Sequence, residues 1–196
     1  MKKIILSFLF LLLSFISNAQ NLSYGVLLGL TTYDSNNNNN QSNFSSNPKQ
    51  TILNLGGYVD YRFSNNIGLK TDVTFNQKEL SLLNSSVNFK LNFIEISPNL
   101  KYDFGDEYRK GFYMLIGPRF SFLTSAKAEG VDTTSLFNTT NIGLQLGLGY
   151  RIFKFIDLEG KFDYGVTPFI ENKNDNSKFF GTYISLNLDL ERIINK

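Results

Sequence analysis

The feature that most constrains this chain is an alternation between apolar and polar side chains with a period of two. In 142–152, aliphatic side chains and a tyrosine occupy the even positions, whereas glycine, Gln145 and Arg151 occupy the odd positions. A period of two is that of a β-strand, whose successive side chains point to opposite faces of a sheet. The pattern recurs in eight segments: 22–31, 53–63, 67–78, 88–104, 112–123, 142–152, 156–167 and 180–190. Because no segment carries a 3.6-residue apolar stripe, the sequence predicts an all-β fold.

The charged residues of these segments are confined to the face opposite the apolar side chains. In a soluble barrel the apolar face would point inward, but an eight-stranded barrel is only wide enough inside for its own side chains. Eight faces of leucine, isoleucine, phenylalanine and tyrosine would overfill such a core. Glycines such as Gly143 and Gly147 also lie on the charged face, where they suit a crowded concave lumen. We therefore predict an eight-stranded antiparallel up-and-down transmembrane β-barrel with lipid outside and polar side chains inside.

The charged face contains eight acidic and six basic residues, a near balance that predicts ion pairs filling the lumen. We name this set the lumen charge network: Asp60, Arg62, Lys70, Asp72, Glu95, Lys101, Asp103, Arg119, Arg151, Asp157, Glu159, Lys161, Asp163 and Asp189. The run from Asp157 to Asp163 could alternatively provide paired carboxylates for acid–base chemistry or cation binding. Mixed charge argues against a single-sign selectivity filter, so we expect a structural role.

The segment 88–104 changes phase, because Phe89, Leu91 and Phe93 alternate oppositely to the apolar residues that follow. A β-bulge near Phe93–Ile94 would reconcile the two phases, since one extra residue exchanges the faces.

The connections are long at 33–50, 124–138 and 168–178 and short at 64–66 and 153–154. Long loops alternating with short turns are typical of outer-membrane barrels, whose long loops are extracellular. The first long loop includes the polyasparagine run 36–40, which is either a solvated loop or a receptor-binding loop. We regard the three long loops as the candidate surface for a protein partner.

Residues 1–19 have the pattern of a secretory signal peptide. Lys2 and Lys3 precede an apolar stretch that is too short for a transmembrane helix, and small residues occupy the −3 and −1 positions of a cut after Ala19. Cleavage would leave a barrel domain of residues 20–196 with 17 basic and 17 acidic residues, because the 19 basic residues of the chain include these two lysines. A formally neutral chain gives no reason to expect a nucleic-acid partner.

The chain contains no histidine and no cysteine. The usual nucleophile pairs and transition-metal ligands are therefore missing, and we expect neither enzyme activity, nor a cofactor, nor a metal site. The composition and pattern favour a non-enzymatic outer-membrane protein with a structural or interaction role. Two alternatives stay open: an accessory component of outer-membrane transport or protein secretion, and a soluble periplasmic ligand-binding β-barrel.

Residues 93–102, 112–120, 143–150 and 157–165 resemble the PorT-type outer-membrane β-barrel domain that is common in Bacteroidetes. The resemblance extends over most of 22–190 and implies an outer-membrane location and the architecture of small OmpA-type barrels. Some members of that family are linked to protein secretion. The chain departs from the usual barrel pattern at its end, which lacks a terminal aromatic residue and reads LERIINK over 190–196.

Overall fold

The strands of a computed structural model account for most of the chain. The structure describes residues 21–36, 44–46, 52–82, 87–105, 108–170 and 176–194, so the predicted signal peptide and its cleavage site at Ala19 lie outside the described residues. The long strands are β1 (Leu22–Asn36), β3 (Ile52–Arg62), β4 (Ile67–Leu82), β5 (Asn88–Asp103), β6 (Phe112–Ala128), β8 (Thr140–Phe153), β9 (Ile156–Gly165) and β10 (Lys178–Asp189). The short elements are β2 (Phe44–Ser46), β7 (Val131–Asp132), the 3₁₀-helix η2 (Thr134–Leu136) and the helix α2 (Leu190–Ile194).

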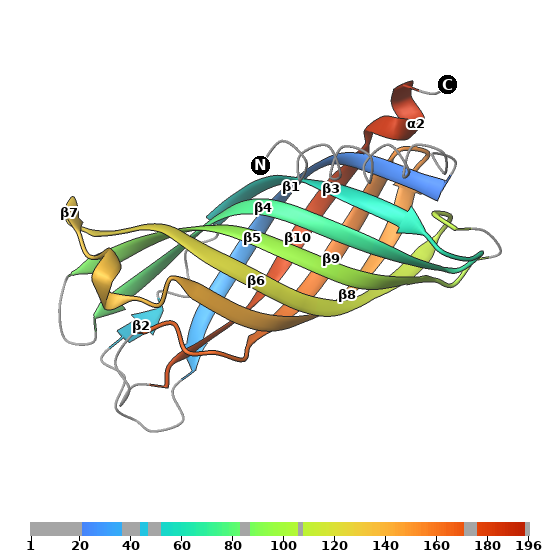
Figure 1. The fold of residues 1–196 in the computed structure, drawn as a ribbon. Helices are drawn as coiled ribbons and strands as arrows, with labels where there is room; N and C mark the ends of the chain where they lie inside the picture. The colour runs from blue at the N-terminus through green and yellow to red at the C-terminus, as the bar shows by residue number, and fades with distance from the viewer. Residues whose placement is uncertain are drawn as a thin grey trace, which may run out of the picture.

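The eight long strands form a closed ring (Figure 1). Each pairs antiparallel with two neighbours in the order β4-β3-β1-β10-β9-β8-β6-β5, and the pairing of β4 with β5 closes the ring. Closure leaves none of these strands at a sheet edge, so their backbone groups can hydrogen-bond within the ring without water. The predicted eight-stranded antiparallel β-barrel is confirmed.

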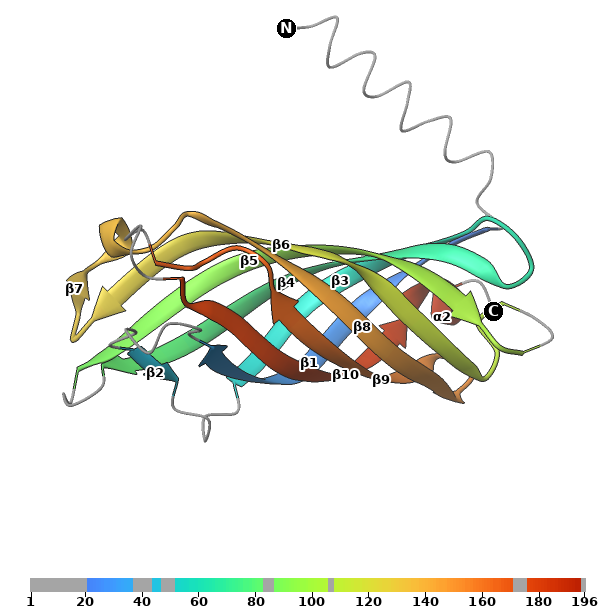
Figure 2. The same ribbon diagram turned by 90° about the horizontal axis from the view of Figure 1, so that it is seen from below.

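The two ends of the barrel differ, as Figures 1 and 2 show. At one end the strands are joined across 63–66, 104–111 and 154–155; we call this the short-turn end. The connections 37–51, 83–87, 129–139 and 166–177 lie at the opposite, long-loop end, where β4, β5 and β6 continue past the other strands and pair with β2 and β7. The connections predicted to be long and those predicted to be short lie at opposite ends, but the alternation is incomplete, because 83–87 at the long-loop end is shorter than 104–111 at the short-turn end. In addition, β1 and β6 extend into two of the predicted loops, to residues 36 and 128.

The outer wall is apolar and the lumen is polar. Leu146 and Leu158 are 54% and 42% exposed, whereas Gln145 and Glu159 are 3% and 1% exposed. The same alternation holds around the ring, so a continuous belt of leucine, isoleucine, valine, phenylalanine and tyrosine faces outward. This arrangement is the reverse of that of a soluble barrel and contradicts the soluble periplasmic alternative, because such a belt exposed to water would be an aggregation site.

Aromatic rings form a girdle on the outer wall at the short-turn end. The ring centroids of Tyr102 and Phe104 are 5.1 Å apart, and Phe112 continues the row to Tyr150 at 6.2 Å. Tyr61 of β3 and Phe63, which directly follows that strand, form a second contact of this kind. Aromatic girdles of transmembrane barrels mark the boundary between hydrocarbon and headgroups.

The prediction of a bulge near Phe93–Ile94 is wrong in two respects: the extra residue lies on the neighbouring strand, and the two faces of β5 are not exchanged. Along β5 every odd residue from Phe89 to Asp103 is buried, so the phase of that strand never changes. The register of the β5–β6 ladder shifts between Asn92 and Phe93, but the extra residue is Thr124 on β6. Phe89 and Phe93 are apolar residues that point into the lumen, a case that the alternation pattern cannot distinguish from a bulge.

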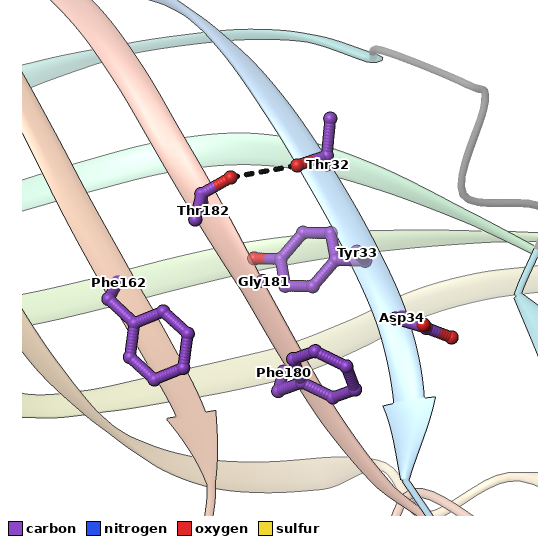
Figure 3. Close-up of a pocket in the computed structure, with 7 residues that line it drawn as sticks. All are labelled: Thr32, Tyr33, Asp34, Phe162, Phe180, Gly181 and Thr182. Atoms are coloured by element: carbon purple, nitrogen blue, oxygen red, sulfur yellow. Dashed lines mark hydrogen bonds between the residues drawn. The ribbon is translucent and has the colours of Figure 1, made fainter.

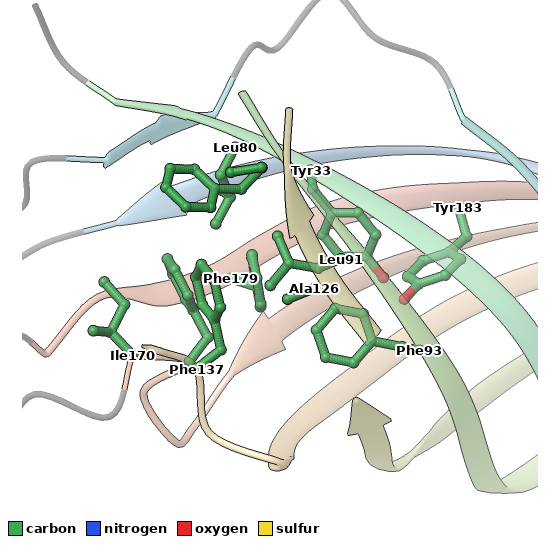
Figure 4. Packing of buried hydrophobic residues seen from close by; sticks show 12 residues of the cluster. Tyr33, Leu80, Leu91, Phe93, Ala126, Phe137, Ile170, Phe179 and Tyr183 are labelled. Carbon is green, nitrogen blue, oxygen red and sulfur yellow. The ribbon is translucent and has the colours of Figure 1, made fainter. Parts of the chain in front are cut away.

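These inward apolar residues belong to a cluster that fills the lumen at the long-loop end (Figure 4). We name it the apolar cluster, and its members are Tyr33, Leu80, Phe89, Leu91, Phe93, Ala126, Ala128, Phe137, Phe169, Ile170, Phe179 and Tyr183. Phe137, Phe169 and Ile170 come from the connections, and Phe169 stacks on Phe179 of β10 with centroids 4.0 Å apart. The cluster therefore holds two long connections against the barrel mouth.

Inward glycines make room for inward tyrosines on the neighbouring strand. Tyr113 of β6 is paired with Gly149 of β8, and Tyr58 of β3 is paired with Gly25 of β1. A Cβ atom on Gly149 would lie 2.1 Å from the Tyr113 ring, a distance that no packing tolerates. Glycine is thus required at these positions by the width of the lumen.

The last barrel strand ends at Asp189, and α2 follows directly. In the part of the chain that the structure describes, no helix is long and apolar enough to cross a membrane.

Candidate functional site

The lumen brings most of the predicted charge network together in four groups of ion pairs. The first group surrounds Glu95, a fully buried carboxylate of β5. Its Oε1 atom accepts hydrogen bonds from Lys78 Nζ at 2.8 Å and from Ser121 Oγ at 2.7 Å, and lies 3.3 Å from Arg119 Nη1. Its Oε2 atom accepts from Tyr183 Oη at 2.8 Å and from an asparagine at 3.0 Å. We name these residues the Glu95 group.

Arg119 joins the Glu95 group to a second strand. Its Nε atom donates to Asp163 Oδ1 at 2.8 Å, and its Nη2 atom donates to Asn141 Oδ1 at 3.0 Å. The guanidinium, which is 0% exposed, therefore spans from β5 across to β8 and β9. A planar group with five donors suits this role, because it can satisfy two carboxylates at fixed angles.

The second group is a quartet of alternating charge on β4 and β9. Lys70 Nζ lies 2.6 Å from Glu159 Oε2 and 3.2 Å from Asp72 Oδ1. Lys161 Nζ lies 2.8 Å from Glu159 Oε1 and also pairs with Asp72. Each charge thus has two partners of opposite sign, which offsets the cost of removing all four from water.

The third group surrounds Lys101. Its Nζ atom lies 2.9 Å from Asp60 Oδ2 and 3.5 Å from Asp103 Oδ2. Tyr108, from the connection between β5 and β6, enters the barrel end and donates its hydroxyl to Asp60. Burial, together with the negative charge of Asp60, raises the pKa of Tyr108 above its ordinary value, so the phenol is held neutral.

The fourth group closes the short-turn end. Arg151 pairs with Asp157, and its Nη1 atom lies 3.2 Å from Asp189 Oδ2. Asp189 also accepts a hydrogen bond from Ser23 Oγ at 3.0 Å, which joins the first barrel strand to the last. Arg109 lies 3.7 Å from Asp189 and 2.8 Å from Glu191 of α2, so the terminal helix is fixed to this rim.

Arg62 alone of the predicted network lies apart from these groups. Its Nε and Nη2 atoms donate to Asn21 Oδ1 at 3.0 and 2.6 Å, and among the described residues it forms no ion pair. Arg62 is the last residue of β3, half-buried at the end of the barrel. Its inclusion in the network was wrong, because alternation predicts the face of a residue but not its depth.

Lys78 was missed as a member of the network, although its phase along β4 matches that of Lys70 and Asp72. Its ammonium is 0% exposed and sits among three rings, at 4.1 Å from the centroid of Tyr33, 4.6 Å from Phe179 and 4.7 Å from Phe93. Together with the bond to Glu95, these cation–π contacts join the polar lumen to the apolar cluster.

A small pocket of about 200 Å³ lies on the outer wall near the long-loop end (Figure 3). Thr32 of β1 and Thr182 of β10 share a hydrogen bond of 2.8 Å there, beside Phe162 and Phe180. In Figure 3 the Tyr33 ring lies against Gly181. Over the described residues, no group of three or more acidic side chains is arranged to hold a metal ion.

A closed ring of eight strands, an apolar outer belt with an aromatic girdle and a lumen of paired charges together define a small transmembrane β-barrel. The sequence comparison gives the same class in more specific terms. Residues 18–171 match the family described as "Outer membrane protein beta-barrel domain", and the chain belongs to this family. The protein is therefore an outer-membrane barrel; in barrels of this class the long loops are extracellular and the short turns periplasmic.

The chain is similar to several solved structures. Neisserial surface protein A is similar with a TM-score of 0.54 and 17% identity over 84% of this chain and 96% of that one. The attachment invasion locus protein Ail of Yersinia pestis has a TM-score of 0.47 and 13% identity, with 85% and 97% covered. OprG of Pseudomonas aeruginosa has a TM-score of 0.45 and 12% identity, with 84% and 93% covered. No curated protein sequence matches the chain at a significant level.

Proposed function

We propose that the protein is a non-enzymatic outer-membrane barrel whose lumen is plugged by its own charged side chains and whose role is structural or interactive. The observation that carries this proposal is the small free volume inside the lumen. The cavity between the Glu95 group and the quartet, lined by Gln145, Ser97 and Asn54 among others, has a volume of about 10 Å³. A single water needs about 10–15 Å³, so no hydrated ion or solute fits.

The ion pairs make this plug difficult to move. Lys70, Lys101 and Arg119 are at most 1% exposed, and each contacts two carboxylates. Breaking a buried pair costs roughly 3–5 kcal/mol, because the remaining charge stays buried without a partner. The apolar cluster adds a second obstruction on the extracellular side. A spontaneous opening would have to disrupt several of these groups at once.

Planar-bilayer recording tests the plug directly. Purified mature protein, with insertion verified by heat-modifiable gel mobility, should give no stable conductance steps in 1 M KCl. A matched control replaces the quartet by serines (Lys70→Ser, Asp72→Ser, Glu159→Ser and Lys161→Ser) and should also stay silent, because three other groups and the apolar cluster still block the lumen. Steady single-channel conductance steps from the wild type would contradict the proposal of a plugged lumen and would favour the alternative role in transport.

The extracellular connections are the proposed interaction surface, within the predicted loops 33–50, 124–138 and 168–178. Support comes from Phe137 and Phe169, which fix the second and third connections to the apolar cluster. A surface held in one conformation loses less entropy when it binds a partner. Removing the two rings, by Phe137→Ala and Phe169→Ala, should increase protease cleavage in these connections while the barrel keeps its heat-modifiable mobility.

A role as an accessory of outer-membrane transport or protein secretion is the second candidate. It rests on the resemblance to PorT-type barrels, and both that subfamily and a Bacteroidetes origin stay predictions. Cleavage of the signal peptide after Ala19 is likewise a prediction. Intact mass of the protein purified from outer membranes should correspond to a chain that begins at Gln20, and a mass that includes residues 1–19 would contradict cleavage.

A further inference from the structure

The terminal helix α2 carries an exposed apolar stripe. Leu190, Ile193 and Ile194 are spaced i, i+3 and i+4, so their side chains lie on one face of the helix. Ile193 is 38% exposed and Ile194 is 65% exposed, and both follow the last strand of the barrel by only a few residues. A stripe of this spacing is the face that an amphipathic helix turns away from water.

The polar side chains of α2 bind the short-turn end of the barrel. Glu191 Oε2 accepts a hydrogen bond from Arg109 Nη2 at 2.8 Å. The guanidinium of Arg192 donates to the backbone carbonyls of Lys154 and Arg109 at 3.1 and 3.4 Å. These acceptors and the donor belong to two different connections of the short-turn end. The contacts therefore fix the rotation of α2 about its own axis, and they leave the apolar stripe on the side that faces away from the rim.

The helix begins where the lipid-facing belt ends. Asp189, the last residue of β10, is paired with Gly25 of β1, so Leu190 follows at the level of Tyr24, which is 40% exposed on the outer wall. Leu190 is also the next residue in the outward phase of Leu186. In Figure 1, α2 leaves the wall beside β1 and points away from the barrel, across its long axis. The helix therefore runs along the membrane surface, and its apolar stripe continues the belt.

We propose that α2 is an interfacial anchor, which inserts Leu190, Ile193 and Ile194 into the lipid leaflet at the short-turn end. The partner is the boundary between headgroups and acyl chains, where amphipathic helices bury their apolar face by about 5–10 Å. A helix of five residues is too short to bind a membrane alone, but the barrel already holds α2 at this level. The anchor in turn keeps Arg109 and Arg192 at the rim of the lumen. The proposal does not depend on whether the lumen is plugged.

Tryptophan fluorescence tests the proposal, because the chain contains no tryptophan of its own. The Ile194→Trp variant of the mature protein is reconstituted in phosphatidylcholine bilayers whose acyl chains carry bromine either near the glycerol or near the terminal methyl group. Insertion is verified by heat-modifiable gel mobility. The fluorescence should be quenched strongly by the shallow bromines and weakly by the deep ones, since the stripe lies at the interface. Acrylamide in the water should quench it little.

Two further variants calibrate the measurement. Asn65→Trp is the matched control, because Asn65 is exposed in the turn 64–66 at the same end of the barrel; it should be quenched by acrylamide and not by bromine. Leu146→Trp, in the middle of the belt, should be quenched most by the deep bromines. The proposal is overturned if Ile194→Trp is quenched by acrylamide as strongly as Asn65→Trp, which would leave the stripe in water for a protein partner. Equal quenching of both by shallow bromines would also overturn it, because tryptophan itself favours the interface.

Discussion

The buried carboxylate of Glu95 provides the sharpest test of how the lumen stabilises the barrel. Replacing it by glutamine keeps its size and removes its charge. Five donors converge on Glu95, among them Lys78 Nζ at 2.8 Å and Arg119 Nη1 at 3.3 Å. In the Glu95→Gln variant the amide NH₂ group would face donors, and Lys78 would lose its ion-pair partner while fully buried. The free energy of unfolding should fall by roughly 3–5 kcal/mol, the cost of an orphaned buried charge.

The assay is urea unfolding in detergent micelles, followed by the loss of the compact band on unheated gels. Glu79→Gln is the matched control, because Glu79 faces outward and contacts the 61% exposed side chain of Lys90 at 3.5 Å. Its loss should cost about 0–1 kcal/mol. Adding Lys78→Met to Glu95→Gln removes the orphaned charge and should recover at least about 1 kcal/mol. Equal stability of the two glutamine variants would refute the view that the lumen pairs maintain the fold.

Three further changes test other parts of the barrel. Gly149→Ala places a methyl group against the Tyr113 ring and should cost about 1–3 kcal/mol in the same unfolding assay, whereas Gly160→Ala, whose nearest neighbouring atom is 4.0 Å away, should be neutral; equal effects would contradict the packing. Leu146→Arg on the lipid face should cost about 2–4 kcal/mol, and a neutral result would mean that this position does not face hydrocarbon. The pKa of Tyr108 is raised in the folded protein. Its contribution to the free energy of unfolding is therefore complete below the pKa of tyrosine in the unfolded chain, about 10, and is lost as the pH rises above that value. The free energy of unfolding, measured from pH 8 to 12, should depend less on pH in the Tyr108→Phe variant than in the wild type.

Alternation alone was enough to predict the strands and their faces. A period of two reports directly which side chains share a face, and an eight-stranded ring leaves only one face that can accept charge. The pairing of Lys70 with Glu159 could not be predicted, because it depends on the register and tilt of strands far apart in the sequence. At the level of the membrane, membership of the lumen was predictable for most charged residues, whereas the partners within the lumen were not.

The sequence failed where the barrel leaves the membrane. Above the hydrocarbon level the lumen of this protein is apolar and its outer face is polar. The same side of each strand still faces the lumen there, but that side now carries apolar residues instead of charged ones. Phe89 and Phe93 were therefore read as a bulge, and Lys78 was omitted although it sits among aromatic rings. Arg62 was assigned wrongly for a different reason: it is the last residue of β3, and at that end of the barrel its side chain binds Asn21 and no carboxylate among the described residues. The alternation pattern predicts which face of a strand a residue occupies, but not how far along the barrel axis the residue lies.

The contact between Ser23 and Asp189 has a consequence for how the protein is made. These residues are 166 positions apart, and they join the first and last strands of the ring. Until β10 has been delivered, β1 has an unpaired edge that would hydrogen-bond to any exposed strand, including that of another unfinished chain. An exported chain that still lacks β10 can therefore aggregate through this edge, whereas the closed barrel cannot. Such a protein needs protection from aggregation between export and insertion, and this need ends when the last strand, β10, pairs with β1.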